Sequence, residues 1–281
     1  MSDSIGTRPD STFRLRRRTP GSFVMVPCPK IGRSLRCQGQ LERALAIVLA
    51  GCPVARQIQE QPMKIWYGWN ESRQGTQIRL LEQEPKTRRD RTTGERYSYV
   101  VPDFLVSMLD GTYLLIEVKP SRKLATEVVQ RKLAVAATLA ANREWSFHVV
   151  TERELFRTPL VRNLSFVARY RLFAENPAIS AQLLHQVTEE GIQFGKLIGN
   201  SSCELLSSKQ HALHLLASEQ LSFDPVLQEL TNSSRVYPKS VISWDPFDLA
   251  WASSFYSMDG PIVWSANSPT TATLPKTQNS T

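Results

Sequence analysis

The sequence predicts an α/β protein, with a mixed sheet flanked by helices and then a small helical or winged-helix-like domain. Residues 97–108 and 112–118 are rich in β-branched and aromatic residues and flank Asp110-Gly111, which predicts a β-hairpin. Residues 38–51 and 122–142 have the apolar spacing of helices, and residues 145–149 alternate like a strand. The resulting order is helix, strands, hairpin, helix, strand.

Four segments follow from composition and periodicity. The first is rich in arginine and has little apolar periodicity, so we expect a flexible arm, and the last is rich in Thr, Ser and Asn and is expected to be disordered. The predicted segments are 1–30 (basic arm), 31–157 (α/β domain), 158–266 (helical or winged-helix-like domain) and 267–281 (tail).

The register of the hairpin depends on the length of its loop. A two-residue Asp110-Gly111 turn would pair Phe104 with Glu117, whereas a three-residue loop from Leu109 pairs Asp103 with Glu117. We therefore expect an odd-length loop or a compensating bulge, with Gly111 at positive φ. Pro102 fits just before Asp103, where a backbone donor can be spared.

Two helices flank this hairpin in sequence. Residues 38–51 form a predicted helix that ends at Gly51, with Glu42 in its first turn. The second predicted helix covers residues 122–142. Its apolar stripe is Leu124, Val128, Leu133, Val135 and Leu139.

The chemistry of the chain is concentrated in Asp103, Glu117 and Lys119. Glu117 and Lys119 are two residues apart on one strand, so they share a face, while Val118 points the other way into a core. Two carboxylates and an ammonium can hold divalent cations, activate a water and neutralise a phosphodiester under attack. The alternative is a strand with solvated charges. Glu42 could complete the set, or it could merely stabilise the start of its helix.

Several motifs together resemble one family. The element order with Glu42, Asp103, Glu117 and Lys119 resembles the restriction-endonuclease-like core of the PD-(D/E)XK nucleases. More narrowly, residues 30–160 resemble TnsA, the endonuclease subunit of heteromeric transposases. The motifs that carry this resemblance are Ser34, Leu41-Glu42, Tyr99-Val-Val-Pro-Asp-Phe, Ile116-Glu-Val-Lys-Pro and Thr151-Glu-Arg-Glu-Leu.

This resemblance implies a function and a ligand set. Glu42, Asp103, Glu117 and Val118 are the expected metal ligands, and Lys119 is the expected catalytic lysine. The expected cofactor is Mg²⁺ or Mn²⁺, as two ions. The implied substrate is the double-stranded DNA of transposon ends, whose 5′ strands are cut while a DDE-type transposase (TnsB-like) cuts the 3′ strands. The other implied partner is an AAA+ ATPase regulator (TnsC-like). By the same resemblance, the second domain would contact either this regulator or the transposase.

The charge of the chain is uneven. Residues 1–150 hold 24 Lys/Arg and 14 Asp/Glu, whereas residues 151–281 hold 10 and 12. A basic face on the first half is expected for phosphate contact, although a solvated positive face would look the same. The predicted DNA-binding residues are Arg16, Arg17, Arg18, Arg88, Arg89, Arg91, Arg122 and Lys123, with Arg14, Lys86, Arg131 and Lys132 as further candidates.

Other functional classes have little support in the sequence. The four cysteines lack paired spacing, so we expect reduced thiols, and His211 and His214 are better explained as helix-surface residues than as zinc ligands. No signal peptide is recognisable, and the longest apolar run, 44–55, is too short for a bilayer. We expect a protein of the bacterial cytoplasm that has no membrane partner. A serine-nucleophile motif and a phosphate-binding glycine loop are also absent.

The second half carries helical patterns at residues 160–173, 178–187 and 207–221, then strand-like segments at 234–244 and 261–264. An aromatic group at Trp244, Phe247, Trp251 and Phe255 is typical of core packing or of a partner-docking surface.

Three functions remain open from the sequence. The first is a TnsA-like endonuclease acting inside a transposition assembly. The second is a stand-alone PD-(D/E)XK nuclease of restriction, repair or phage origin. The third is a non-catalytic DNA-binding scaffold on the same fold, because a fold alone does not determine activity.

Overall fold

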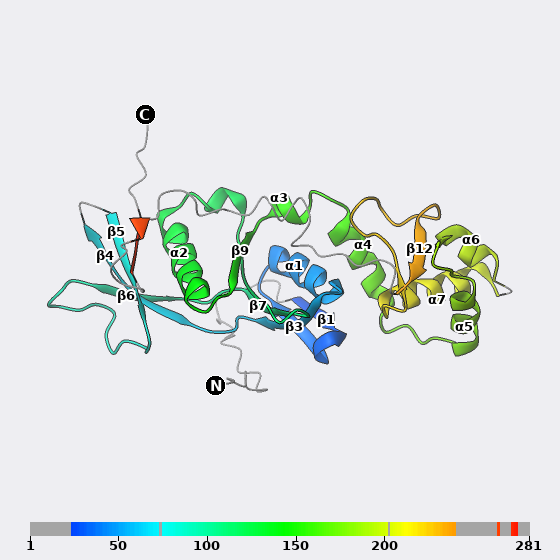
Figure 1. The fold of residues 1–281 in the computed structure, drawn as a ribbon, viewed down its shortest axis with the longest axis horizontal. Coiled ribbons are helices and arrows are strands. Elements are labelled where there is room, and N and C mark those ends of the chain that lie inside the picture. Colours follow the sequence, from blue (N-terminus) through cyan, green and yellow to red (C-terminus); the bar gives the residue numbers. More distant parts are fainter. Residues whose placement is uncertain (1–23, 73–74, 202, 240–262, 265–270, 275–281) are drawn as a thin grey trace, which may run out of the picture. The chain divides into compact units, whose positions relative to one another are not determined.

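A computed structural model describes residues 24–72, 75–201, 203–239, 263–264 and 271–274 (Figure 1). The chain forms two units. Among the described residues, the first unit comprises 24–42, 55–151 and the two short strands after residue 262, and the second comprises 43–54 and 152–239. The division falls within helix α1 (Gln40–Gly51), after Glu42. Within the described part of the chain, no helix is long and apolar enough to cross a membrane.

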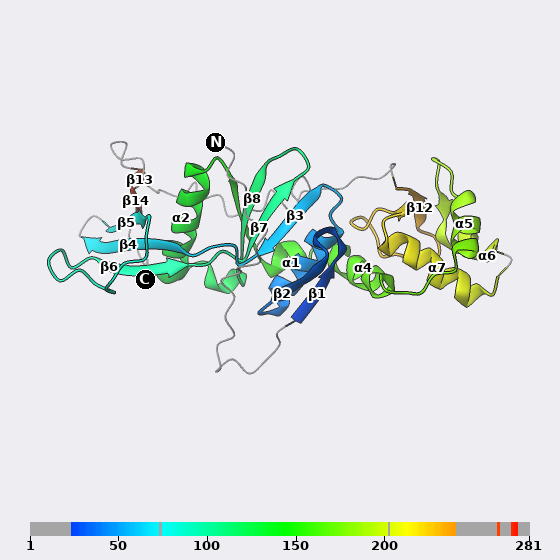
Figure 2. The same ribbon diagram turned by 90° about the horizontal axis from the view of Figure 1, so that it is seen from below.

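The first unit contains the predicted mixed sheet. Its strand order is β3 (Ala55–Glu60), β7 (Phe104–Met108), β8 (Tyr113–Val118) and β9 (Ser146–Val150). The first three strands pair antiparallel, and β9 runs parallel to β8. A parallel neighbour needs a crossover, which α2 (Glu127–Asn142) supplies (Figure 2).

The hairpin has the predicted odd-length loop. Phe104 pairs with Ile116 and Ser107 pairs with Tyr113, while the N–H of Met108 donates to the carbonyl of Thr112. Leu109, Asp110 and Gly111 therefore form a three-residue loop, and Gly111 has φ 89°. This register places Asp103 opposite Glu117.

The segment predicted as one strand from residue 97 to 108 is two strands in two sheets. Pro102 and Asp103 separate β6 (Arg96–Val100) from β7, because Pro102 cannot donate to a ladder and the chain passes from one sheet into the other there. β6 belongs to a second, antiparallel sheet of order β13-β14-β5-β4-β6. Its other strands are β4 (Ile65–Ser72), β5 (Gly75–Leu81), β13 (Val263–Trp264) and β14 (Thr271–Leu274).

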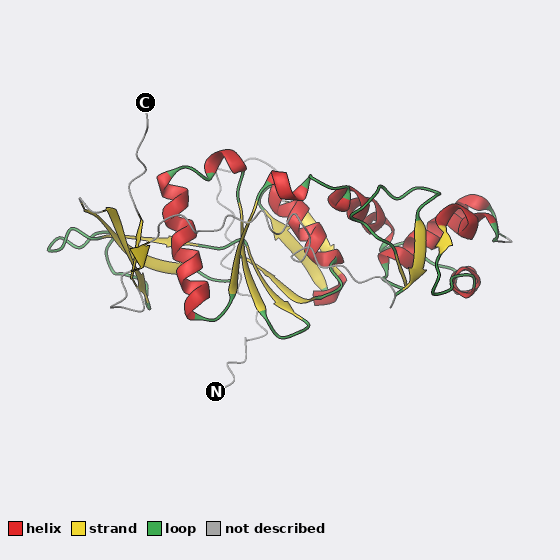
Figure 3. Cartoon of the chain, turned by 45° about the horizontal axis from the view of Figure 1, so that its top comes forward, coloured by secondary structure: helices red, strands yellow, loops and turns green. Residues whose placement is uncertain are grey.

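Helix α2 lies between the two sheets of the first unit (Figure 3). Its buried residues share one core with side chains from β4, β7 and β8, including Tyr67, Leu105 and Leu115. The helix was expected from residue 122, but Ser121–Lys123 is a short 3-10 helix (η2) and the α-helix begins at Glu127. Val128, assigned to the apolar stripe, is 53% exposed because it lies in the first turn.

Each of the two predicted unstructured ends contains a strand. The last residues of the expected arm form β1 (Val24–Cys28), which pairs with β2 (Arg33–Cys37) across the 3-10 helix Pro29–Ile31 (η1). In the expected tail, β14 pairs with β5. Residues 1–23, with Arg14, Arg16, Arg17 and Arg18, lie outside the described residues, as do Trp244, Phe247, Trp251 and Phe255.

The second unit is helical with a three-stranded antiparallel sheet of order β10-β12-β11. Its buried core includes Leu183, Leu197, Leu213 and Val236. The predicted helices are present with shifted ends, whereas α6 was missed because six residues are too few for a periodic pattern. Its elements are α3 (Glu152–Leu155), α4 (Leu160–Val167), η3 (Ala168–Tyr170), α5 (Pro177–His185), β10 (Ile192–Gln193), α6 (Phe194–Gly199), α7 (Leu205–Ala217), β11 (Leu221–Ser222) and β12 (Arg235–Pro238).

Candidate active site

The hairpin holds two predicted site carboxylates next to each other. Asp103 precedes β7 and Glu117 lies near the end of β8, both on the side of the sheet where Leu105 and Leu115 pack in the core with α2. The backbone N–H of Val118 donates to Oδ2 of Asp103 at 2.7 Å. This bond orients the Asp103 carboxylate toward β8.

Lys119 joins the two carboxylates. Its Nζ lies 2.5 Å from Oε1 of Glu117 and 3.6 Å from Oδ2 of Asp103. The same ammonium donates to the carbonyl oxygen of Val118 at 3.1 Å. The Val118 side chain is buried in the core. Val118 therefore contacts the cluster through its backbone oxygen and not through its side chain. The structure thus brings together four of the residues singled out in the sequence.

One carboxylate oxygen of this cluster has no partner. Glu117 is 3% exposed, and its Oε2 is buried without a hydrogen bond among the described residues. An unsatisfied buried carboxylate oxygen costs on the order of 1–3 kcal/mol, so it is retained in a fold only where something else is gained. A hard cation that prefers oxygen ligands would satisfy it, together with Asp103 and the carbonyl of Val118.

Glu42 is near this cluster but does not complete it by contact. It lies in the first turn of α1, where the N–H of Gln38 donates to its Oε2 at 2.7 Å. Its charge acts on Asp103 and Lys119 through space. Within the described part of the chain, no group of three or more His, Cys, Asp or Glu side chains is arranged to hold a metal ion. Glu42 therefore serves its own helix start in this structure, while remaining within electrostatic reach of the hairpin pair.

Burial raises the pKa of every carboxyl in the site. Burial and the charge of Asp103 raise the pKa of Glu117 to about 8 and that of Glu42 to about 7. Burial also raises the pKa of Asp103, against the opposing effects of Lys119 and the Val118 N–H. Burial alone would lower the pKa of Lys119, but Asp103, Glu117 and Glu42 together raise it. Lys119 is therefore a permanent cation. The carboxyls bind protons more readily than usual, because Lys119 alone does not offset their negative charge.

Two of the three predicted DNA-binding groups lie within the described residues. Arg88, Arg89 and Arg91 are exposed in the connection between β5 and β6, and Arg122 and Lys123 are exposed in η2. Lys132, on α2, lies close enough to Glu117 to lower its pKa. The site therefore receives positive charge from α2 as well as from Lys119.

Gln61 is a positioning residue that the sequence analysis missed. It follows β3 with φ 45°, a left-handed conformation that is costly for a residue other than glycine. Its N–H donates to the carbonyl of Asp103 at 2.8 Å, which fixes the backbone just before β7. No residue pattern around Gln61 predicts a positive φ, so only coordinates could identify it.

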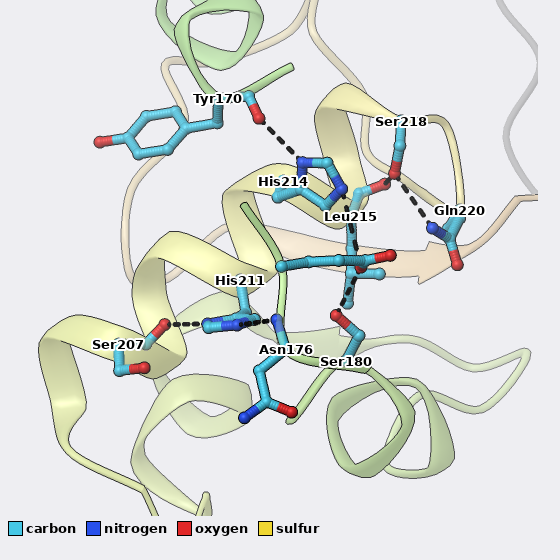
Figure 4. Close-up of polar contacts among 10 residues, drawn as sticks. Tyr170, Asn176, Ser180, Ser207, His211, His214, Leu215, Ser218 and Gln220 are labelled. Carbon is cyan, nitrogen blue, oxygen red and sulfur yellow. Dashed lines mark hydrogen bonds and ion pairs between the residues drawn. The ribbon is translucent and has the colours of Figure 1, made fainter. Parts of the chain in front are cut away.

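The sequence predicted that His211 and His214 lie on a helix surface, but this prediction is wrong. His211 and His214 are buried in the second unit (Figure 4). His211 contacts the carbonyl of Ser207 through Nδ1 and accepts the N–H of Asn176 at Nε2, and Nδ1 of His214 contacts the carbonyl of Tyr170. The helical pattern could not predict this burial, because Asn176 and Tyr170 come from segments distant in sequence. None of the four cysteines, Cys28, Cys37, Cys52 and Cys203, forms a disulfide bond, and the first three are buried.

A mixed sheet with paired carboxylates and a lysine on one hairpin is compatible with a nuclease core. Comparison with protein families bears this out. Residues 53–152 match the family model described as TnsA-like endonuclease N terminal, which confirms the resemblance drawn from the motifs. The match includes Asp103, Glu117 and Lys119 but begins after Glu42. This segment, about a third of the chain, is therefore similar to the N-terminal domain of TnsA-like endonucleases. No match was found in the comparison with curated proteins.

Proposed function

We propose that this protein is a divalent-metal-dependent DNA endonuclease of a transposition system, which cleaves the 5′ strands at transposon ends in cooperation with a DDE-type transposase. The observation that carries the proposal is the buried, unpartnered Oε2 of Glu117 beside Asp103 and Lys119, within the segment that matches the TnsA-like family. A TnsB-like transposase and a TnsC-like AAA+ regulator are the proposed partners, in keeping with the family.

The residues that would hold Mg²⁺ or Mn²⁺ are Asp103, Glu117 and the carbonyl of Val118, with Glu42 as a further acidic residue. When bound, the metal supplies an activated water and positive charge at the attacked phosphate. Asp103 is held ready by the Val118 N–H, which fixes one of its oxygens. Lys119 interacts with both carboxylates, so it either orients the water or offsets charge on the phosphate.

The second unit supports a role in partner binding. From α5 onward its elements run helix, strand, helix, helix, strand, strand, and the last of these strands lies in the middle of the sheet. This arrangement supports a winged-helix-like module. Its sequence contributes no excess of basic residues. We therefore assign protein contacts to this unit and DNA cleavage to the first.

The test is strand cleavage of a transposon-end duplex by the full chain, with its transposase partner and Mg²⁺. Asp103→Asn keeps an acceptor for the Val118 N–H but removes the charge, so cutting should fall at least about a hundredfold. Asp110→Asn makes the same change in the exposed loop of the same hairpin and should cut like the wild type. Wild-type cutting by Asp103→Asn contradicts the proposed site. Full cutting without any partner contradicts the proposed cooperation and favours a stand-alone nuclease.

A further inference from the structure

A tryptophan in the first unit gathers two arginines from different elements. Trp69 lies on β4, on the face where Ile65 and Tyr67 pack in the core with α2. The guanidinium carbon of Arg131, on α2, is 3.6 Å from the centre of the Trp69 ring. That of Arg96, at the start of β6, is 4.9 Å from the same centre. Arg96 is the direct cross-strand neighbour of Trp69, so the two side chains leave the sheet on the same face.

These two cations lack a counterion within the described part of the chain. Neither arginine forms an ion pair there, and Nε of Arg131 is buried without a hydrogen-bond partner. Glu71, two residues beyond Trp69 on the same face of β4, pairs with neither arginine among the described residues. The aromatic ring attracts each guanidinium, but it does not satisfy their N–H donors. Two guanidinium groups with spare donors are a site for a bidentate oxyanion.

We propose that Arg96 and Arg131 bind one backbone phosphate of the DNA strand that flanks the cut, with Trp69 holding both guanidinium groups in place. This proposal rests on the proposed function, which makes DNA the anion that the first unit meets. Helix α2 supports it, because Arg131 is followed directly by Lys132, whose charge acts on Glu117. One helix thus presents adjacent cations to the catalytic cluster and to the Trp69 site.

The experiment measures binding of a fluorescent transposon-end duplex by the full chain carrying Asp103→Asn, at several salt concentrations. Adding Arg96→Gln, which changes an exposed residue, should weaken binding about tenfold at low salt and make the logarithmic salt dependence shallower by about one. Arg131→Gln should do the same. Since both arginines contact one phosphate, the double variant should lose little more than either single variant.

The matched control is Arg143→Gln. Arg143 follows α2, and its guanidinium carbon lies 4.9 Å from the ring centre of Trp145. The substitution therefore removes a similar cation–π contact elsewhere on the unit. Wild-type affinity and salt dependence in both Arg96→Gln and Arg131→Gln would overturn the inference, as would an equal loss in Arg143→Gln or no duplex binding by the parent chain. This experiment measures binding and not cutting. A failure of the proposed endonuclease function would therefore appear only in the cleavage assay described above, which compares Asp103→Asn with the wild type.

Discussion

Two clusters of buried ionisable side chains in this protein differ in how fully their polar atoms are satisfied. In the second unit, both ring nitrogens of His211 have backbone partners, and Glu175 accepts from Ser180 while facing His214. In the first unit, Glu117 keeps a buried oxygen without a partner, and the pKa values of three neighbouring carboxyls are raised. The polar atoms of the histidine cluster have the hydrogen-bond partners that a structural network requires. The carboxylate cluster has a buried oxygen that a further positive group would satisfy.

The two clusters are expected to contribute differently to stability and to function. A satisfied buried network stabilises the fold, so its loss should cost stability without affecting chemistry. An unsatisfied acidic cluster costs stability, so its loss should stabilise the fold and remove activity. The two clusters should therefore respond to mutation in opposite ways.

The largest effect is expected for Lys119→Met. It removes the cation that contacts both carboxylates, so cleavage should fall about a hundredfold to ten-thousandfold. The chain should still fold, because the two carboxyls can take up protons. The measurement is strand cleavage together with thermal unfolding. Lys209→Met, an exposed change in the second unit, is the control, and equal cleavage by the two variants would show that Lys119 is not catalytic.

The next effect distinguishes the two interpretations of Glu42. Glu42→Gln keeps an acceptor for the Gln38 N–H and removes the charge. If Glu42 contributes to the metal site, cleavage should fall about a hundredfold while the melting temperature is unchanged or higher. If Glu42 only stabilises its helix start, cleavage by this variant will match the wild type.

A smaller effect, opposite in kind, is expected for His211→Ala. It leaves the Asn176 N–H and the Ser207 carbonyl without their buried partner, so the free energy of unfolding should fall by about 2–3 kcal/mol. Denaturant unfolding gives this value. His185→Ala changes an exposed histidine in the same unit and should be neutral. Cleavage at temperatures where the variant is folded should equal that of the wild type. A loss of cutting by the folded variant would show that the histidine cluster is not purely structural.

The smallest effect concerns pH. The pKa of Glu117 is raised from 4.5 to about 8, so the folded chain binds more protons than the unfolded chain between these values. The stability that Glu117 contributes in its protonated form is therefore lost as pH rises through this window. Without metal, Glu117→Gln should exceed the wild type in stability by an amount that grows from pH 5 to pH 8, on the order of 2 kcal/mol. A constant difference across this range would refute the raised pKa.

The local features of the hairpin that carries Asp103 and Glu117 were predictable from sequence. Asp110-Gly111, the odd-length loop that pairs Asp103 with Glu117, and the shared face of Glu117 and Lys119 all follow from turn chemistry and the two-residue period of a strand. The family motifs then pointed to the TnsA-like endonuclease domain, as the family match confirms.

What the sequence did not reveal depends on contacts between distant segments. The assignment of β6 and β7 to different sheets depends on which strand each one meets, although Pro102 marks the break. The burial of His211, the positive φ of Gln61 and the gathering of Arg96 and Arg131 at Trp69 have no local pattern. These features arise from tertiary packing, which a periodicity along the chain does not describe.

The proposed function requires the Asp103–Glu117–Lys119 cluster to bind a divalent cation in place of protons. Calorimetric titration with MgCl₂ or MnCl₂ at pH 7, in buffers of different ionisation enthalpy, measures binding and proton release together. We expect the wild type to bind the metal and release protons, because the pKa of Glu117 is about 8 and that of Glu42 about 7. The double variant Asp103→Asn with Glu117→Gln should lose both signals. Absence of metal binding by the wild type, or identical binding by the double variant, would contradict it.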